Sequence, residues 1–342
     1  MGKKEATQIS ALGEFGLIDR LTQRLKRRND STLLAAGDDA AVIGTTEEVT
    51  LLTTDMLTEG IDFDLSYFPL KHLGYKAVVR GVNDILAMNG TPRQIVVALG
   101  ISAKITVEAL DELYEGMELA AGELGVDIVG GDTTASMNGL IITVTAMGVA
   151  KRDEVVYRSG AKEHDLICIT SNLGAAYMGL HLLEREKRVL KDIDNPEPKC
   201  AGYEYLLERY LKPRAKGNVL AALREEGIRP TSMIDLSDGL ASDIRQICRA
   251  SKCGARIYLE RIPIARQTSE LAEEMHIDPV IAALNGGEDH ELLFTVPLEH
   301  KDKVAALGLV DIIGHITREE AGVVLVTPDG EGIALKAQAF DR

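Results

Sequence analysis

Hydrophobic and polar positions follow two different periods in the first part of the chain. The run 48–55, EVTLLTTD, is rich in residues that favour β-structure and ends in polar side chains, so it predicts a strand. Across 69–90, apolar or small residues recur at helical spacing from Leu70 to Ile85, with proline at the start and Asn-Gly at the end. This segment is therefore predicted to be a long helix.

The same alternation of strands and helices continues to about residue 150. The run 93–101 predicts a second strand, and a helix is expected to begin at Thr106 and to end near Gly125. The short run VDIVGGD and the long run LIITVTAMGVA then predict two more strands. Together these elements predict an N-terminal domain over 1–150.

A charged, irregular stretch at 151–164 marks the junction to a C-terminal domain over 151–342. The predicted elements beyond the junction include a strand at 165–170, a helix near 173–186, a polar insert at 191–199 and a helix over 239–251. Strands and helices alternate without the G-x-G-x-x-G motif of a dinucleotide-binding fold. An α+β fold with helix-covered sheets is therefore favoured over a Rossmann domain.

Composition and charge exclude several classes of protein. The 342 residues suffice for two domains with their own cores, and four scattered cysteines predict neither a disulfide framework nor a zinc site. The net charge is −15, and we expect the basic residues not to gather into a run, which argues against nucleic acid as a partner. No signal peptide and no run of ~20 apolar residues is found, so we expect a cytoplasmic protein without a membrane partner.

Aspartate is the residue that carries the candidate chemistry. Five separate segments place aspartates beside apolar runs or on the long helix, at Asp38 and Asp39, Asp55, Asp84, Asp132, and Asp235 with Asp238. Any one of them could be only a helix cap or a turn residue. Brought together, however, they would repel one another unless cations lay among them. All the candidate ligands are oxygens, which favours Mg²⁺ or Mn²⁺ shared with a nucleoside triphosphate.

Other metal and phosphate motifs fit poorly. The run DLSDGLASDIRQ superficially resembles an EF-hand loop, but its glycine is at the fifth position and Gln246 is at the twelfth. The chain also has no Walker A motif, no protein-kinase motif, no G-x-S-x-G and no H-E-x-x-H. If the protein transfers phosphoryl groups, it does so without the nucleotide-binding motifs of P-loop enzymes or protein kinases.

Eight ordered motifs resemble one family. They are GEFGLIDRL, GDDAAVI, TTDMLTEG, VNDILAMNGTP, GGDTT, RSGAK, IDLSDGL and GGEDHELLFT. In this order the motifs resemble those of thiamine-monophosphate kinases, which belong to the PurM-like superfamily of aminoimidazole-ribotide synthetase. The resemblance extends from about residue 12 to about residue 330.

The resemblance implies an enzyme that phosphorylates thiamine monophosphate to thiamine diphosphate with ATP and several Mg²⁺ ions. It also implies a two-domain PurM-like α+β fold in which the N-terminal domains of a homodimer pair into a β-barrel. The metal ligands of the family fall on Asp39, Thr53, Thr54, Asp55, Asp84, Asp132, Asp235 and Asp238. The nucleotide contacts fall on Tyr114, Gly131, Asp132, Arg158 and Ser237, and the substrate contacts on Asp62, Glu288 and Phe340.

The expected reaction is direct in-line transfer, because phosphoryl transfer needs placement and charge neutralisation more than covalent chemistry. We expect no phosphoenzyme and no catalytic histidine. Two positions depart from the family, which often has histidine at Asp62 and tyrosine at His290. We expect His290 to be structural. For Asp62, a solvated acid on a loop is as good an interpretation as a substrate contact. Arg80 is expected to pair with Asp84, four residues further along the helix.

Two alternatives remain open on the sequence. A PurM-like synthetase that activates an amide or carbonyl oxygen of another metabolite would use similar metal and ATP residues. A catalytically silent nucleotide-binding or scaffold protein is disfavoured by the full set of aspartates.

Overall fold

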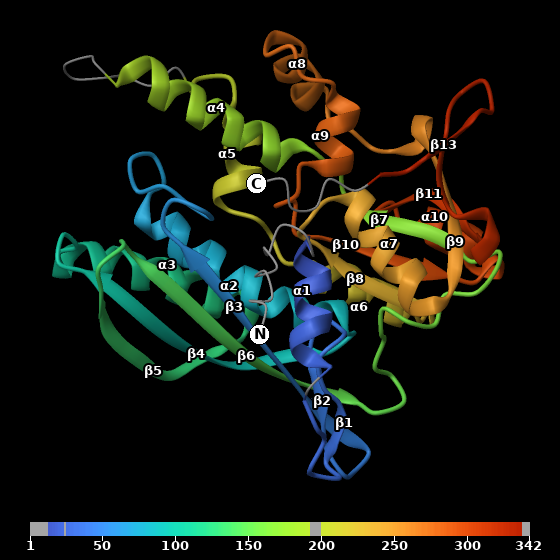
Figure 1. Cartoon of the computed structure of the whole chain (residues 1–342), viewed down its shortest axis with the longest axis horizontal. Coiled ribbons are helices and arrows are strands. Elements are labelled where there is room, and N and C mark those ends of the chain that lie inside the picture. Colours follow the sequence, from blue (N-terminus) through green and yellow to red (C-terminus); the bar gives the residue numbers. More distant parts are fainter. Residues whose placement is uncertain (1–12, 24, 192–199, 337–342) are drawn as a thin grey trace, which may run out of the picture.

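The computed structural model describes residues 13–23, 25–191 and 200–336. The chain forms two mixed β-sheets, each packed with helices, one in the N-terminal part and one in the C-terminal part (Figure 1). The predicted two-domain α+β fold is confirmed. The boundary at 150/151 stays a prediction, although β6 ends at Lys151 and the next strand begins at Leu166.

The first sheet has six strands in the order β1-β2-β3-β6-β4-β5. These strands are β1 (Thr32–Leu34), β2 (Ala41–Ile43), β3 (Glu48–Thr58), β4 (Thr91–Ser102), β5 (Asp127–Ser136) and β6 (Ile141–Lys151). Neighbouring strands are antiparallel except for the parallel pair β4 and β5. The helices of this part are α1 (Gly13–Thr22), α2 (Leu70–Ala87) and α3 (Val107–Leu124).

The two faces of the first sheet differ in what covers them. Helices α2 and α3 lie over one face (Figure 1), and strand side chains such as Leu51 and Val144 are buried beneath them. The opposite face has no helix over it in the described part of the chain. It exposes Leu52, Val96 and Met147, which belong to three different strands. The sheet therefore leaves one apolar face without a cover.

Local sequence accounts for the ends of α3. The side chain of Thr106 accepts a hydrogen bond from the Ala109 amide at the first turn, and Gly125 ends the helix in a left-handed conformation, with φ 65°. A hydroxyl cap and a C-terminal glycine are the usual signals for these two positions. Both predicted ends of this helix are confirmed.

The second sheet has seven strands in the order β13-β12-β9-β11-β7-β10-β8. They are β7 (Leu166–Thr170), β8 (Ser232–Leu236), β9 (Cys253–Tyr258), β10 (Glu291–Val296), β11 (Val310–Arg318), β12 (Val323–Val326) and β13 (Gly332–Ala334). The helices are α4 (Ala175–Leu190), α5 (Glu204–Leu211), α6 (Gly217–Glu225), α7 (Leu240–Ser251), α8 (Arg266–Glu274), α9 (Pro279–Asn285) and α10 (Lys301–Ala306). Three 3₁₀ turns, η2 (Leu259–Arg261), η3 (Leu298–His300) and η4 (Glu319–Ala321), complete this part.

Helix α2 joins the two parts of the molecule. It packs against α3 and the first sheet, and it also contacts β8 at the edge of the second sheet. All five residues of β8 are buried, and the amide of Met233 donates to the carbonyl of Tyr157 in the segment between the parts. Side chains on α2 can therefore reach the ends of strands from both sheets.

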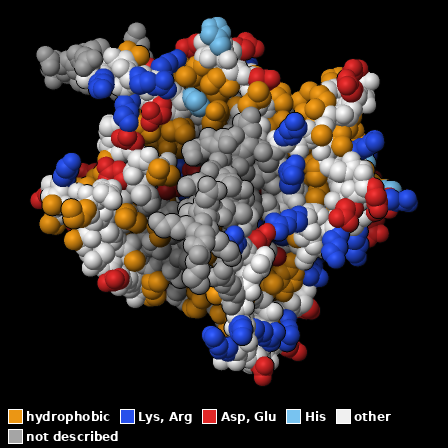
Figure 2. Space-filling view, viewed as in Figure 1, with side chains coloured by type: hydrophobic (Ala, Val, Ile, Leu, Met, Phe, Trp, Pro, Cys, Tyr) orange, Lys and Arg blue, Asp and Glu red, His pale blue; other side chains and the backbone are white. Residues whose placement is uncertain are grey.

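The surface carries charge of both signs. Figure 2 shows Lys and Arg side chains gathered at the lower tip of the visible face, near β1 and β2. Lys26, Arg27 and Arg28 are consecutive and exposed just before β1, so basic residues do form one short run, contrary to our expectation. In the described ranges no helix combines the length and hydrophobicity needed to span a bilayer. Most of the polar insert at 191–199 lies outside the described residues.

Two glycines allow α2 and α3 to touch through their backbones. A Cβ atom at Gly74 would lie 1.9 Å from the Leu113 carbonyl oxygen, and one at Gly116 would lie 1.8 Å from the Lys71 carbonyl oxygen. Any larger residue would force the helices apart. The position of α2 depends on this contact.

We expect Gly116→Ala to lower the free energy of unfolding by about 1–3 kcal/mol, because the added methyl group overpacks the helix crossing. The matched control is Gly122→Ala, on the same helix, where an added Cβ meets nothing within 4 Å. That change should be neutral or should stabilise by up to ~1 kcal/mol through helix propensity. Urea unfolding of both variants measures the difference, and equal stabilities would contradict the packing argument.

Candidate functional site

Three aspartates from distant parts of the sequence meet between the two sheets. Asp39 lies in the loop between β1 and β2, Asp84 lies on α2, and Asp235 is near the end of β8. One carboxylate oxygen from each residue lies within 4.8 Å of the others. These three residues, which we call the aspartate trio, were all predicted as metal ligands from the sequence.

Strand β3 supplies further oxygens to the same place. The Thr53 hydroxyl donates a hydrogen bond of 2.5 Å to Asp84, and Asp55 lies on the same face of the strand. Thr54 lies between them, so its side chain points to the opposite face, where its hydroxyl bonds Thr145 at 3.0 Å. The structure therefore gathers the side chains of Thr53 and Asp55 at the trio but not that of Thr54.

Burial and mutual repulsion disfavour ionisation of the trio. Burial raises the pKa of Asp235 to about 8, with the neighbouring Asp39 and Asp55 adding to the effect. The pKa of Asp84 is raised well above its usual range by burial and then by Asp55, Asp235 and Asp39. Burial also raises the pKa of Asp39, although Arg158 opposes this. The positive charge of Arg158 is therefore not enough to balance the negative charge of the three carboxylates.

The donor set fits a hard divalent cation. The Asp39 Oδ2 and Asp55 Oδ2 atoms are buried and have no hydrogen-bond partner among the described residues. Buried carboxylate oxygens are otherwise nearly always hydrogen-bonded. Carboxylate and hydroxyl oxygens without histidine or cysteine are the ligands that Mg²⁺ prefers.

Arg158 lies against the trio from the segment between the two sheets. Its Nη2 is 2.6 Å from Asp39 Oδ1, and its backbone amide donates to both carboxylate oxygens of Asp38 at 3.1 Å. Burial and the nearby charge of Asp39 raise the pKa of Asp38 to about 7. A guanidinium in this position can also meet an anionic group bound at the trio.

The turn after β8 presents Ser237 and Asp238 next to Asp235. Gly239 follows with φ 101°, and a Cβ atom there would lie 2.8 Å from the Leu284 carbonyl oxygen, so only glycine fits this turn. The amide of Asp238 donates to the buried carboxylate of Asp243, in the first turn of α7. Asp243 was not found from the sequence, where it reads as an ordinary residue of an amphipathic helix.

A second charged group adjoins the trio and contains both described residues predicted to contact substrate. Arg80 donates to Asp55 at 3.2 Å and to Asp62 at 3.1 Å, and its Nη1 is 3.8 Å from Glu288 Oε1. Our prediction that Arg80 pairs with Asp84 is wrong, because three carboxylates from other segments surround it. Asp62 is also held by the amide of Thr58, so it is not a solvated loop acid.

Lys76 completes this group and was missed from the sequence. Its ammonium lies 2.7 Å from Glu288 Oε2, and its side chain is 1% exposed. Burial lowers the pKa of the neighbouring His290, and neither ring nitrogen of His290 has a hydrogen-bond partner in the described part of the chain. The only hint in the sequence was a lysine inside the apolar pattern of the helix, four residues before Arg80.

The remaining predicted residues lie elsewhere. Gly131 and Asp132 are on β5, at the edge of the first sheet, and Tyr114 is half exposed on α3. Strands β6 and β4 separate β5 from β3, so about 14 Å of sheet lies between Asp132 and the β3 residues. Asp132 is in register with Met56, on the face opposite to Asp55. Phe340 lies outside the described residues.

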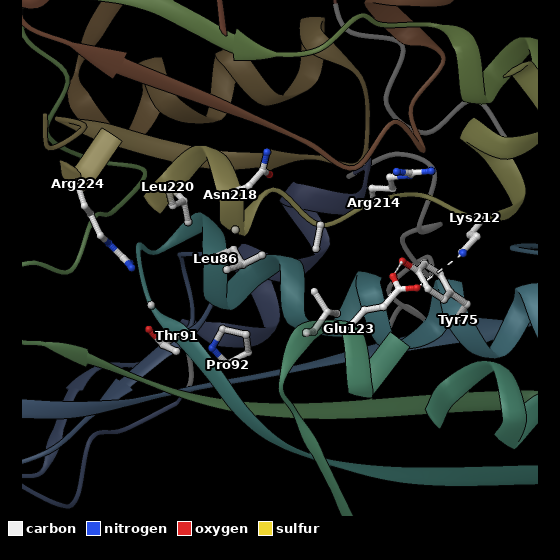
Figure 3. Close-up of a pocket in the computed structure, with 14 residues that line it drawn as sticks. Tyr75, Leu86, Thr91, Pro92, Glu123, Lys212, Arg214, Asn218, Leu220 and Arg224 are labelled. Atoms are coloured by element: carbon white, nitrogen blue, oxygen red, sulfur yellow. Dashed lines mark hydrogen bonds and ion pairs between the residues drawn. The ribbon is translucent and has the colours of Figure 1, made fainter. Parts of the chain in front are cut away.

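A separate cavity of about 670 Å³ lies between the C-terminal end of α2 and the segment leading into α6. Figure 3 shows Lys212, Arg214 and Arg224 around it, with Lys212 joined to Glu123. None of the predicted site residues lines this cavity. It is therefore distinct from the place where the aspartates meet.

Comparison with known proteins places these features in a family. The N-terminal and C-terminal domain models of AIR synthase related proteins match residues 37–150 and 162–327. The thiamine-monophosphate kinase of Bacillus subtilis is 30% identical over 97% of this chain and 99% of its own length. The corresponding enzyme of Escherichia coli K12 is 33% identical over 97% of this chain and 98% of its own length.

A solved structure agrees with the sequence matches. The protein described as AaThiL complexed with AMPPCP and TMP superposes with a TM-score of 0.82 at 28% identity, covering 96% of this chain and 97% of that chain. The chain therefore belongs to the thiamine-monophosphate kinase family, within the AIR synthase related proteins.

Proposed function

We propose that the protein transfers the γ-phosphoryl group of ATP to thiamine monophosphate and forms thiamine diphosphate. The observation that carries the proposal is the aspartate trio, in which Asp39, Asp84 and Asp235 converge from both domains with too little positive charge. Such a site is suited to divalent ions that also bind phosphate oxygens. Family membership over nearly the whole chain agrees with this chemistry.

Mg²⁺ would be held by the trio with Asp55, Asp238 and the Thr53 hydroxyl, and would neutralise charge on the transferring phosphoryl group. Arg158 would bind the polyphosphate from the other side, exchanging part of its bond to Asp39 for phosphate oxygens. Ser237 would contact the nucleotide from the turn after β8. The residues orient the reactants and offset charge, and none acts as a covalent nucleophile.

The acceptor would bind at the charged group around Glu288. A phosphate oxygen of thiamine monophosphate attacks the γ-phosphorus while the bond to the β-phosphate oxygen breaks, and ADP leaves. The acceptor phosphate is already ionised near neutral pH, so no general base is required. Asp62 and Glu288 would face the cationic thiazolium and the aminopyrimidine, because carboxylate oxygens attract the positive charge and accept hydrogen bonds from the amino group. Phe340 is proposed as a further contact to this moiety.

We also propose that the active form is a homodimer whose first sheets pair into a barrel. Two observations support this: the exposed apolar face of the first sheet, and the separation of Asp132 from the trio within one chain. A second copy packed on that face would bring its own Tyr114, Gly131 and Asp132 to the site. Each site would then combine residues of both subunits.

We expect purified protein with ATP, Mg²⁺ and thiamine monophosphate to form thiamine diphosphate, measured by chromatography. Unphosphorylated thiamine serves as the control acceptor and should give no product. Asp235→Asn should lower kcat/KM by at least about 10–100-fold, because it removes a ligand charge from the trio. The fold should persist, since losing one of several crowded charges relieves repulsion.

Product from thiamine itself would overturn the assignment of the acceptor. Full activity of a folded Asp235→Asn variant would contradict the role of the trio. The alternative synthetase activity would show as ATP hydrolysis that depends on a different small metabolite, with no thiamine diphosphate formed.

We expect Mg²⁺ to stabilise the nucleotide-free protein more at about pH 8 than at about pH 5.5. The folded pKa of Asp235 is about 8, above its ordinary value of 3.8, so the folded state holds an extra proton between these values. In the absence of ions, its contribution to stability therefore falls as pH rises through this window. At a concentration of about 100 times Kd, Mg²⁺ should add roughly 3 kcal/mol, measured as a rise in Tm.

Asp84→Asn should reduce this gain at high pH, because it removes both a ligand and a source of repulsion. An equal rise in Tm at both pH values, or none at either, would contradict the proposed ion site.

The shared site can be tested by mixing two inactive variants. Asp132→Asn and Asp235→Asn damage different halves of each proposed site, so a hybrid dimer has one site with both residues intact. Random exchange of equal amounts should restore about a quarter of wild-type activity. No recovery after unfolding and refolding the mixture would contradict a site built from two subunits.

A further inference from the structure

Lys76 is a lysine whose charged group is buried inside the protein. It lies in the middle of the buried side of α2 with its ammonium enclosed by protein, whereas lysine is almost never fully buried unless paired. The one carboxylate within ion-pair distance in the described ranges is Glu288, at 2.7 Å. The aromatic rings of Tyr210 and Phe68 lie beside the ammonium, with centroids 4.1 and 5.6 Å away.

A role in stability alone does not explain this pair. Removing two charges from water is expensive, and well-packed apolar residues of similar volume often serve a fold equally well or better. Lys76 could make three hydrogen bonds, but the structure gives it one ionic partner and two ring faces. The arrangement instead constrains the position of the Glu288 carboxylate.

The loop that carries Glu288 is fixed from its other side. Glu288 and His290 have left-handed backbone conformations, with φ of 63° and 50°, which are strained for residues other than glycine. Their amides donate to the carbonyl oxygens of Ser237 and Leu236, so the loop is fastened to the turn that follows β8. Backbone strain of this kind is typical of functional sites.

The Glu288 carboxylate is held at one oxygen and open at the other. Its Oε2 meets Lys76, while Oε1 is 3.8 Å from the nearest Arg80 nitrogen, beyond hydrogen-bond distance. The side chain is 16% exposed, although Lys76 behind it is sealed from solvent. Burial would raise the pKa of Glu288, but Lys76, His290 and Arg80 outweigh this and hold the pKa well below its usual range.

Arg80 lies between the Glu288 carboxylate and the residues around the aspartate trio. It bonds Asp55, beside the trio, and Asp62, the other predicted substrate contact. Lys76, Arg80 and Asp84 are spaced four residues apart, so they lie along one face of α2. The helix thus sets the distance between the ion-binding residues and Glu288.

We propose that Lys76 is a positioning residue for the acceptor: it holds Glu288 as an oriented carboxylate whose free oxygen receives the cationic thiazolium and aminopyrimidine of thiamine monophosphate. This inference rests on the proposed function. Lys76 does not touch the acceptor; it acts through Glu288.

The test is steady-state kinetics of Lys76→Met, with the two substrates varied separately. We expect KM for thiamine monophosphate to rise about tenfold or more, while KM for ATP with Mg²⁺ stays within about twofold. The matched control is Lys71→Met, on the same helix, because Lys71 is 54% exposed and, among the described residues, its one ion pair is with the exposed Glu115. Both KM values should be unchanged in that variant.

The double variant Lys76→Met/Glu288→Gln separates positioning from packing. If Lys76 acts through Glu288, the double variant should bind the acceptor no more weakly than Glu288→Gln alone. Its Tm should exceed that of Lys76→Met, because it no longer contains a largely buried carboxylate that has lost its nearest cation. If Lys76→Met alone fails to fold, comparing the double variant with Glu288→Gln still shows whether Lys76 acts through Glu288.

Three results would overturn the inference. One is an unchanged KM for thiamine monophosphate in folded Lys76→Met, and another is an equal rise in both KM values. The third is a further loss of acceptor affinity when Lys76→Met is added to Glu288→Gln. If instead the wild-type protein forms no thiamine diphosphate in the same assay, the proposed function itself fails.

Discussion

Repulsion between buried carboxylates is the constraint on which the rest of this structure depends. Asp39 and Asp84 come from the first domain and Asp235 from the second, so the two domains meet at like charges. Such an arrangement persists only if donors and cations are supplied around it. Arg158 and the Thr53 hydroxyl supply part of this, and the Oδ2 atoms of Asp39 and Asp55 remain without hydrogen-bond partners among the described residues.

The charges of the site are divided unevenly. At the trio, negative charge exceeds positive charge, which suits the ions that we propose to arrive with the nucleotide. Around Glu288, by contrast, Lys76 and Arg80 match the carboxylates of Glu288 and Asp62 within the protein. In the proposed function, one end of the site would thus be completed by its substrate, whereas the charges at the other end are already paired within the protein.

Local chemistry explains which elements could be predicted from the sequence. The ends of α3 follow from Thr106 and Gly125, because capping depends on neighbouring residues only. The members of the trio were found because aspartates beside apolar runs or inside a helix pattern are conspicuous, and because all three fall within motifs of the family. Thr54 illustrates the limit of motif matching: strand alternation places its side chain on the face opposite to Thr53, whichever residues a family motif contains.

Residues whose partners are distant in sequence were not predictable in this way. Arg80 was assigned to Asp84 because four-residue spacing is the strongest local rule on a helix. Its actual partners are 18 and 25 residues earlier and more than 200 residues later. In the sequence, Lys76 is only an exception in an apolar pattern. Its contacts with Tyr210 and Glu288, which are distant in sequence, show that it is a buried cation paired with a carboxylate.

The backbone contact between α2 and α3 at Gly74 and Gly116 has a consequence for how such chains can diverge. Since that contact prevents α2 from rotating, a residue inserted or deleted between Lys76 and Asp84 would turn one relative to the other by about 100°. No shift of the helix could compensate. The length of this segment should therefore tolerate no insertions or deletions, whereas surface loops remain free to lengthen or shorten.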